Sequence, residues 1–276
     1  QVDIAVSDKD FEKKGPTLNK YQAIVLDPWT WAGKGWRLKS QLKGLEKQIF
    51  VMDFFGSETP HKNLPVPTQR FLTAFPTPAE RAHTFLGYRM DSSISAIPPA
   101  RVQKKQQGII WGKTLKTLHG KATRQVIARL AEEMELHSTV SLKDAKKMKL
   151  HQNVIFHGML SSQEWHQLLQ ESKFMIGLGH PLSGPSAVDA VARGCMYINP
   201  TYSKAQKGFY QSQHPYLQHT LGEPYVCSYN HLDPEGAFAC ARKALEQDLE
   251  PIVPHDLSED AHRRRVRAIF EPVLGR

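Results

Sequence analysis

From Gly108 onward, short apolar runs alternate with segments of helical periodicity at intervals of about 20 to 30 residues. This alternation predicts a parallel sheet whose strands are joined by crossover helices. The apolar runs that we expect to be strands or strand ends are 108–113, 137–142, 153–158, 174–179, 195–200 and 224–229. The segments with apolar residues at i, i+3 and i+4, which we expect to be the crossover helices, are 121–135, 161–172, 183–194 and 234–248.

The first part of the chain carries fewer such elements. Strand-like runs lie at 2–6, 23–27 and 49–55, with an amphipathic segment at 37–45. These are too few for a complete doubly wound domain, so we expect an incomplete one. The last apolar pattern, at 259–274, predicts a final helix that packs back across the domain junction.

A polar segment separates the two regions. Residues 92–107 contain a Pro-Pro pair and a Lys-Lys pair, a composition typical of linkers. We therefore predict a partial N-terminal α/β domain over 1–91, this linker, a C-terminal α/β domain over 108–254, and the packed-back helix within 255–276.

Composition supports a folded globular protein and limits its partners. The 276 residues are 40% hydrophobic and 23% charged, within the globular range, and the net charge is +9. The basic residues are scattered and lack the interleaved aromatics that stack on bases, so we expect no nucleic-acid partner. A basic nucleic-acid binder stays open as a weaker alternative, which steep salt dependence would reveal. A basic surface would also steer a nucleotide diphosphate toward a cleft.

Neither a membrane span nor a targeting signal is predicted in this chain, because no apolar run approaches about 18 residues. The first residue is Gln rather than Met, which leads us to expect an upstream segment. The three cysteines lack C-x-x-C spacing and allow at most one disulfide. The 13 histidines form no metal-binding motif, so we expect no metal.

The most informative segment is 177–194, where a predicted strand runs into a glycine-rich turn and then a helix. Gly184 suits the N-cap and Pro185 the first helical position. Free backbone N–H groups at such a start can hold a pyrophosphate, and Asp189, one turn inside, can accept hydrogen bonds from a ribose. Equally, the glycines can merely close a turn while Asp189 offsets the helix dipole.

Two further turns follow predicted strands. Gly112 and Lys113 end the first strand of the C-terminal domain, where a glycine permits close approach and a lysine can contact phosphate. A base could lie against the backbone of His157 and Gly158, ahead of a capping-box pair at Ser161 and Glu164. The alternatives are a solvated lysine, an ordinary histidine at a strand end and a serine that only caps.

Three such turns at strand ends of one sheet together predict a nucleotide site. The dinucleotide fingerprint G-x-G-x-x-G and the Walker lysine motif are both absent from the places where they would be needed. We therefore exclude an NAD-dependent dehydrogenase and a P-loop kinase as hypotheses.

A longer ordered set of motifs resembles one enzyme family. HGMLS at 157–161 is followed by GLGHP, a Gly-Pro pair, Asp189-Ala190, Gly194-Cys195, Asn199-Pro200 and SQHPY at 212–216. Segments 52–58, 71–76, 84–88 and 111–113 add to it upstream. The order resembles the N-acetylglucosaminyltransferase V family, the α-1,6-mannosyl-glycoprotein 6-β-N-acetylglucosaminyltransferases of glycosyltransferase family 18.

The resemblance implies a GT-B architecture of two Rossmann-like domains, an acceptor-side domain over 1–91 and a nucleotide-sugar-binding domain over 108–254. It also implies an inverting, metal-independent transfer of GlcNAc from UDP-GlcNAc to the 6-hydroxyl of an α-1,6-linked mannose on an N-glycan. It implies a Golgi location, with any membrane anchor outside this chain. It places Asp53 on the acceptor side and Lys204, or Lys207 if the loop is shifted, near the diphosphate. The donor-binding residues predicted from the turns and the resemblance together are Gly112, Lys113, His157, Gly158, Gly179, Gly184, Pro185, Ser186, Asp189 and Lys204.

Several departures from the family pattern affect this interpretation. Residues 1–20 contain no counterpart of the family's catalytic glutamate, so no catalytic residue is assigned. The loop 59–70 is shorter and lacks a Trp, Ser183 replaces an acidic residue, and the additional cysteines of secreted members are missing. An alternative is therefore a homologue that binds the UDP-sugar without turning it over.

Overall fold

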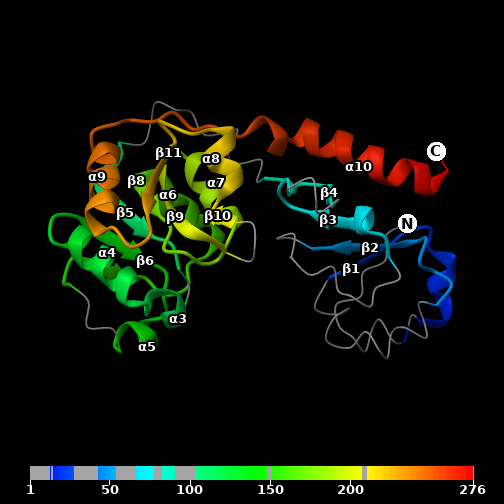
Figure 1. The fold of residues 1–276 in the computed structure, drawn as a ribbon, viewed down its shortest axis with the longest axis horizontal. Coiled ribbons are helices and arrows are strands. Elements are labelled where there is room, and N and C mark those ends of the chain that lie inside the picture. The colour runs from blue at the N-terminus through cyan, green and yellow to red at the C-terminus, as the bar shows by residue number, and fades with distance from the viewer. Residues whose placement is uncertain are drawn as a thin grey trace. The chain divides into compact units, whose positions relative to one another are not determined.

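Two compact units make up the structure, a computed structural model (Figure 1). One unit comprises Gln1–Arg89 with Asp256–Arg276, and the other comprises Met90–His255. The residues that the structure describes are 13, 15–27, 43–53, 66–77, 83–90, 103–112, 114–147, 151–206 and 210–275.

The first unit is built on a four-stranded parallel sheet in the order β1-β2-β3-β4. The strands are β1 (Ile24–Leu26), β2 (Ile49–Met52), β3 (Phe71–Thr73) and β4 (Thr84–Phe85), with 3₁₀ turns η1 (Gly15–Lys20) and η2 (Thr68–Arg70). The core contains Leu18, Ile24, Leu26, Ile49, Val51, Val66 and Phe71. The strand predicted in 23–27 is confirmed at its centre, and the one predicted in 49–55 is confirmed over its first four residues. Residues 2–6 and most of 37–45 lie outside the described residues.

Helix α10 (Glu259–Leu274) belongs to this first unit and has the predicted bounds. Ser258 caps its start by accepting the N–H of Ala261, and Gly275 ends it in the left-handed conformation. The ring of Phe270 lies 4.9 Å from that of Phe50, and Arg265 Nε donates to the Leu86 carbonyl at 2.9 Å. The helix is thus held against the sheet by both apolar and polar contacts.

The second unit contains a parallel sheet in the order β7-β6-β5-β8-β9-β11. From β5 the chain passes through β6 to β7 at one edge of the sheet. It then returns to β8, on the other side of β5, and continues through β9 to β11 at the opposite edge. This is a doubly wound fold, and its topological switch point lies between β5 and β8. The strands are β5 (Lys105–Ile110), β6 (Glu135–Ser138), β7 (Val154–Phe156), β8 (Ser172–Ile176), β9 (Met196–Gln206) and β11 (Val226–Asn230), and β10 (Tyr210–Ser212) pairs antiparallel with the outer part of β9.

Helices cover both faces of this sheet. Phe174 and Ile176 of β8 pack in one cluster with residues of α4 and α9, whereas α6 and α7 contact each other and β8 from the other side. Every residue of β8 is buried, as expected for a strand covered on both faces. The helices are α3 (Leu115–Leu118), α4 (Lys121–Ala131), α5 (Leu142–Ala145), α6 (Ser162–Glu171), α7 (Pro185–Val191), α8 (Pro215–Thr220) and α9 (Pro234–Leu245), followed by η5 (His255–Leu257).

The predicted strand at 137–142 is wrong in its bounds. Strand β6 spans Glu135–Ser138, and the serine at 141 instead caps the short helix α5 by accepting the N–H of Asp144. A serine favours such a cap over a strand interior because its hydroxyl competes for local backbone groups. Strand β5 also begins at Lys105, so it reaches into the segment 92–107 that was predicted as linker.

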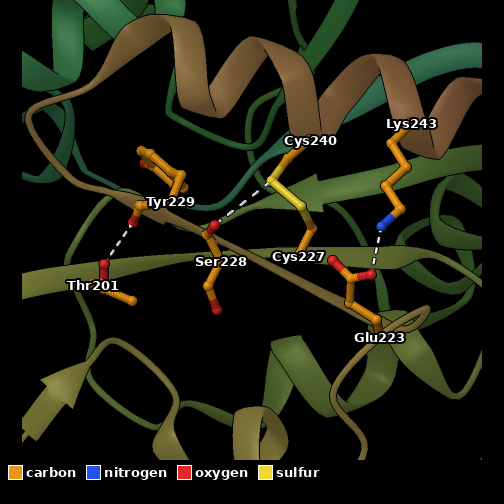
Figure 2. Close-up of a disulfide and its surroundings, with 7 residues drawn as sticks. All are labelled: Thr201, Glu223, Cys227, Ser228, Tyr229, Cys240 and Lys243. Atoms are coloured by element: carbon orange, nitrogen blue, oxygen red, sulfur yellow. Dashed lines mark hydrogen bonds and ion pairs between the residues drawn. A yellow bond between two sulfur atoms is a disulfide. The ribbon is translucent and has the colours of Figure 1, made fainter.

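One disulfide joins β11 to α9. Cys227 and Cys240 are bonded (Figure 2), and their Cα atoms are 5.7 Å apart. Cys195 is a buried free thiol. The prediction of at most one disulfide is therefore confirmed.

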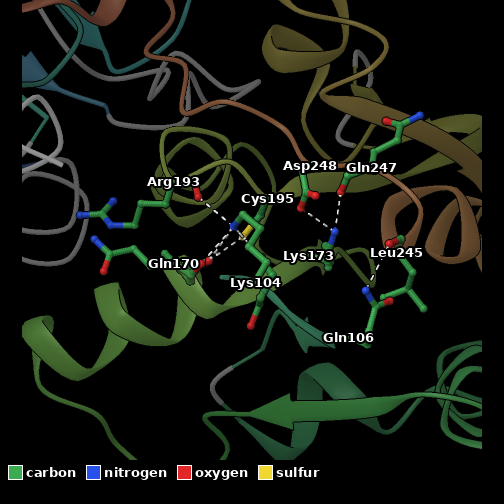
Figure 3. Close-up of polar contacts among 11 residues, drawn as sticks. Lys104, Gln106, Gln170, Lys173, Arg193, Cys195, Leu245, Gln247 and Asp248 are labelled. Atoms are coloured by element: carbon green, nitrogen blue, oxygen red, sulfur yellow. Dashed lines mark hydrogen bonds and ion pairs between the residues drawn. The ribbon is translucent and has the colours of Figure 1, made fainter. Parts of the chain in front are cut away.

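A buried lysine ties the segment before β5 to the helix layer. Lys104 Nζ donates to the carbonyls of Ser172 at 2.8 Å, Arg193 at 3.0 Å and Gln170 at 3.2 Å (Figure 3). These carbonyls lie just past or at the C-terminal ends of α6 and α7, where helices leave acceptors unpaired. Burial lowers the pKa of Lys104.

Among the helices that the structure describes, none has both the length and the hydropathy needed to span a bilayer.

Candidate functional site

The carboxyl ends of β5 and β8 meet at the switch point, where ligands of doubly wound folds bind. Trp111 follows β5 directly, and its N–H donates to the Ile176 carbonyl at 2.9 Å. The glycine-rich segment predicted to hold phosphate starts at Gly177, immediately after β8. The fold therefore places the turn after β5 beside the turn after β8. Lys113 lies outside the described residues.

Gly112 and Gly184 each have a packing reason to be glycine. A Cβ on Gly112 would lie 2.7 Å from Thr117 Oγ1, and one on Gly184 would lie 2.6 Å from Trp111 Cζ2. Contacts this short are not tolerated without a shift of the neighbour. Gly184 lets the start of α7 approach Trp111 in the turn after β5, and Gly112 lets that turn pack against Thr117 of α3. Neither glycine therefore needs a ligand to explain it.

Gln213 holds the loop between β8 and α7. Its Oε1 accepts the N–H of Gly179 at 2.8 Å, and its Nε2 donates to the Pro181 carbonyl at 2.9 Å. Its own carbonyl accepts the N–H of Ser183 at 2.7 Å. Gln213 is fully buried. The Gly179 N–H group therefore already has Gln213 as its partner, although the sequence predicted that Gly179 binds the UDP-sugar.

The backbone conformations of this loop are specific. Gly179 has φ of +103°, which favours glycine, and its carbonyl accepts the Tyr202 hydroxyl at 3.1 Å. Ser183 has φ of +46°, a conformation uncommon for a residue with a side chain. The path of the loop into α7 is therefore held by the hydrogen bonds of Gln213 and Tyr202 and by the uncommon backbone conformation of Ser183.

Helix α7 starts as predicted, with Gly184 at the N-cap and Pro185 at the first helical position. No side chain caps it, so the N–H groups of its first turn have no side-chain acceptor there. Ser186 is half-buried in that turn. The helix spans only seven residues, so loop and first-turn amides rather than a long helix dipole would have to hold an anion.

Asp189 lies one turn inside α7 and faces a cation. Its Oδ1 is 4.0 Å from Nη1 of Arg193, whose side chain is fully buried. A buried guanidinium needs a neighbouring acceptor to offset lost hydration. Asp189 therefore has a role in charge balance that sequence reasoning missed, and its side chain keeps 25% exposure for an outside contact.

His157 and Gly158 follow β7 directly, at the same edge of the sheet. His157 Nε2 lies 2.7 Å from Nδ1 of His137, whose Nε2 lies 3.0 Å from Glu135 Oε1. Burial lowers the pKa of His137. Gly158 has φ of +75°. The capping box of Ser161 and Glu164 is present, as predicted.

Lys204 lies exposed on the outer part of β9, beyond the residues that pair with β8. Tyr202, two residues earlier, lies on the same face and packs edge-on to His231 with ring centroids 5.3 Å apart. Lys207 lies outside the described residues.

Asp53 follows β2 in the first unit and is buried. Strand β2 is central in a parallel sheet, so Asp53 lies at its carboxyl edge.

The SQHPY segment has a structural role around His214. The His214 N–H donates to Asn199 Oδ1 at 3.0 Å, and its Nδ1 accepts the N–H of Leu217 at 3.3 Å at the start of α8. Burial lowers the pKa of His214 to about 3, so the ring is neutral. The shared motif residues at 199 and 214 thus support the loop that Gln213 holds.

Among the described residues, no group of three or more His, Cys, Asp or Glu side chains is arranged to hold a metal ion. The residues that sequence reasoning missed are Gln213, Tyr202 and His137, together with Glu135 at the start of β6. Only Gln213 had a signal, its place in the SQHPY motif.

Solved structures with similar folds define the class. The chain superposes on the UDP-GlcNAc 2-epimerase of Methanocaldococcus jannaschii with a TM-score of 0.55 at 8% identity, covering 95% of this chain and 79% of that one. It superposes on AviGT4, a glycosyltransferase involved in avilamycin A biosynthesis, with a TM-score of 0.51 at 12% identity, covering 83% and 70%. At such identities the likeness shows the fold alone. The α/β fold is of the GT-B class, as predicted.

Sequence comparison then identifies the family. The family model of glycosyltransferase family 18 matches residues 46–272. The chain belongs to this family, which confirms the predicted resemblance.

Curated relatives agree with this assignment. The chain is 28% identical over 232 residues to an α-1,6-mannosylglycoprotein 6-β-N-acetylglucosaminyltransferase A from Cricetulus griseus, covering 78% of this chain and 30% of that protein. It is 23% identical over 253 residues to the human enzyme B, covering 81% and 32%. The chain thus spans about a third of the length of these curated relatives.

Proposed function

We propose that this chain transfers GlcNAc from UDP-GlcNAc to the 6-hydroxyl of an α-1,6-linked mannose of an N-glycan. The single observation that carries the proposal is the glycine-rich loop 177–186 at the switch point of a GT-B fold, in a chain that belongs to glycosyltransferase family 18. Relatives named as α-1,6-mannosylglycoprotein 6-β-N-acetylglucosaminyltransferases support this donor and acceptor.

In this proposal the donor lies along the carboxyl edge of the second unit. The diphosphate occupies the start of α7, where Gly184 and Ser186 contribute backbone amides and no side chain competes as a cap. Gln213 shapes this mouth by holding Gly179 and Ser183. Asp189 accepts from the ribose, the base lies against His157 and Gly158, and Lys204 approaches the diphosphate from β9.

The proposed transfer is a direct displacement with inversion. The acceptor O6 attacks C1 of GlcNAc, the bond between C1 and the UDP oxygen breaks, and a base removes the O6 proton. Asp53 is proposed to bind the acceptor sugar, and no residue is assigned as the base. Following the resemblance, we expect the transfer to proceed in the presence of a metal chelator.

The disulfide between Cys227 and Cys240 supports a Golgi location, since structural disulfides form in oxidising compartments.

Transfer of radiolabelled GlcNAc tests this function. The chain is incubated with labelled UDP-GlcNAc and an acceptor that contains an α-1,6-linked mannose, and the matched control is the same acceptor lacking the 6-hydroxyl of that mannose. We expect label only in the first product, together with equimolar UDP release. Tight UDP binding without transfer to either acceptor would instead favour the non-catalytic homologue.

A further inference from the structure

Three titratable side chains form a line across the face of β6 and the end of β7. Glu135 and His137 lie two residues apart on β6, hence on one face, and His137 pairs in register with Ile155 of β7. His157 is two residues beyond Ile155 and reaches the same face. The contacts run from Glu135 Oε1 to His137 Nε2 at 3.0 Å and from His137 Nδ1 to His157 Nε2 at 2.7 Å.

The two imidazole rings lie nearly in one plane. Their planes differ by 12° and their centroids are 5.0 Å apart. The contacting nitrogens, His137 Nδ1 and His157 Nε2, are only 2.7 Å apart although the ring centroids are 5.0 Å apart. Both nitrogens must therefore lie on the line that joins the two ring centres, each on the side that faces the other ring. Such in-plane alignment is the geometry of an N–H···N hydrogen bond rather than of face-to-face stacking.

The hydrogen-bonding pattern follows from the chemistry of the three groups. An ionised carboxylate only accepts, so His137 Nε2 must carry the proton that Glu135 receives. His137 is 7% exposed and burial lowers its pKa, which keeps it neutral with a lone pair on Nδ1. The short contact then requires a proton on Nε2 of His157. In neutral His157 the remaining nitrogen, Nδ1, is a hydrogen-bond acceptor.

The surroundings of His157 fit a flat ligand. His157 is exposed, and among the described residues its ring has no hydrogen bond other than that to His137. Beside it, Met159 is 96% exposed and Leu142 55% exposed, and Leu142 Cγ lies 3.6 Å from the place of a Cβ on Gly158. Gly158 itself is buried beneath Leu142, so the apolar surface near His157 comes from the exposed side chains of Leu142 and Met159.

We propose that Glu135 and His137 are positioning residues that fix the tautomer of His157, so that its Nδ1 accepts a hydrogen bond from the N3–H of the donor's uracil. This inference rests on the proposed function and adds a reason for base selectivity. Cytosine has no N3–H and presents an acceptor at that place, so a fixed acceptor on the protein disfavours it.

Nitrogen NMR of histidine-labelled protein tests the tautomer without a ligand. In the wild type we expect His157 to be protonated at Nε2 and bare at Nδ1. The substitution Glu135→Ala should produce a mixture of tautomers, whereas the matched control Glu133→Ala, which removes an exposed carboxylate at the end of α4, should not. A wild-type His157 protonated mainly at Nδ1 overturns the proposal.

Calorimetric titration with UDP and CDP tests the contact. We expect the wild type to prefer UDP, and His157→Phe to weaken UDP binding about 3- to 10-fold while leaving CDP binding unchanged or slightly tighter, because the acceptor that opposes cytosine N3 is removed. His137→Leu should act in the same direction, and His137→Asn, whose amide oxygen can replace Nδ1, should recover much of the UDP affinity.

The outcomes separate this inference from the proposed function. If the wild type binds UDP but His157→Phe binds it equally well, the inference is overturned and the function stands. If His157→Phe removes discrimination against 2′-deoxy-UDP instead of CDP, His157 contacts the ribose and the inference is wrong. If the wild type binds no UDP, both fail.

Discussion

The Gly179 N–H group donates to Gln213 Oε1 at 2.8 Å, so a glutamine 34 residues downstream occupies an amide of the loop that was predicted to hold phosphate. The same side chain binds the Pro181 carbonyl at 2.9 Å. The loop is therefore shaped by the protein before any ligand arrives. Preorganisation of this kind lowers the ordering cost of binding.

Replacing Gln213 by Leu should weaken UDP binding by roughly tenfold and lower the free energy of unfolding by about 1–3 kcal/mol, because buried backbone groups at Gly179 and Pro181 lose their partners. Calorimetric titration and denaturant unfolding measure the two effects. The control is Gln211→Leu, an exposed glutamine two residues away on β10. Equal UDP affinities for the two variants would contradict the account of the loop.

Replacing Gly184 by Ala should destabilise the protein by about 1–3 kcal/mol, since the new Cβ would meet Trp111 Cζ2 at 2.6 Å. Thermal unfolding measures this change. The second substitution Trp111→Leu should recover part of the loss in the double variant. Gly120→Ala serves as the control, because its Cβ would meet the Thr123 side chain at 3.3 Å only. Additive losses in the double variant would show that the two residues do not compete for space.

Acidification should destabilise the protein through His214. Burial lowers the pKa of His214 to about 3, whereas the unfolded chain has a histidine pKa of about 6.5. Between these values the unfolded state binds more protons, so stability is present above about pH 6.5 and is lost as the pH falls toward 3. His214→Asn, which keeps a cap acceptor for α8, should flatten the pH dependence of denaturant unfolding. The control His219→Asn, at an exposed histidine of α8, should leave it unchanged.

Removing the disulfide with Cys227→Ser and Cys240→Ser should lower the free energy of unfolding by about 3 kcal/mol, since the bond closes a loop with a separation of 13 residues. Denaturant unfolding with and without a reductant measures this. The wild type should shift on reduction, and the double variant should not. Cys195→Ser, at the free thiol, should keep the response to reductant; a wild type indifferent to reductant would contradict the bond.

Sequence patterns predicted what is local in this fold. The bounds of α10 follow from Ser258, its apolar spacing and the closing glycine, and the start of α7 follows from Gly184 and Pro185. Strand order within the parallel sheet was not predictable from periodicity, because it depends on which strands pair across long separations. The predicted end of β6 was wrong because a Ser cap that opens a short helix resembles the end of a strand locally.

The candidate site was predicted in outline because the turns that form it are marked by local residues. Glycines and a proline after strands mark turns, and these turns lie at the switch point or along its edge. The clamp by Gln213 and the contact between His137 and His157 join residues 20 or more positions apart, so no local pattern could reveal them. The buried Arg193 that faces Asp189 was likewise invisible, because burial of an arginine is set by the folded core.

The most direct measurement is a crystal structure of the chain soaked with UDP. We predict the diphosphate at the first turn of α7 beside Gly184 and Ser186, a ribose hydroxyl within hydrogen-bond distance of Asp189, and the uracil against His157. Density for UDP away from the carboxyl edge of β5 and β8, with the start of α7 left in contact with solvent, would contradict it.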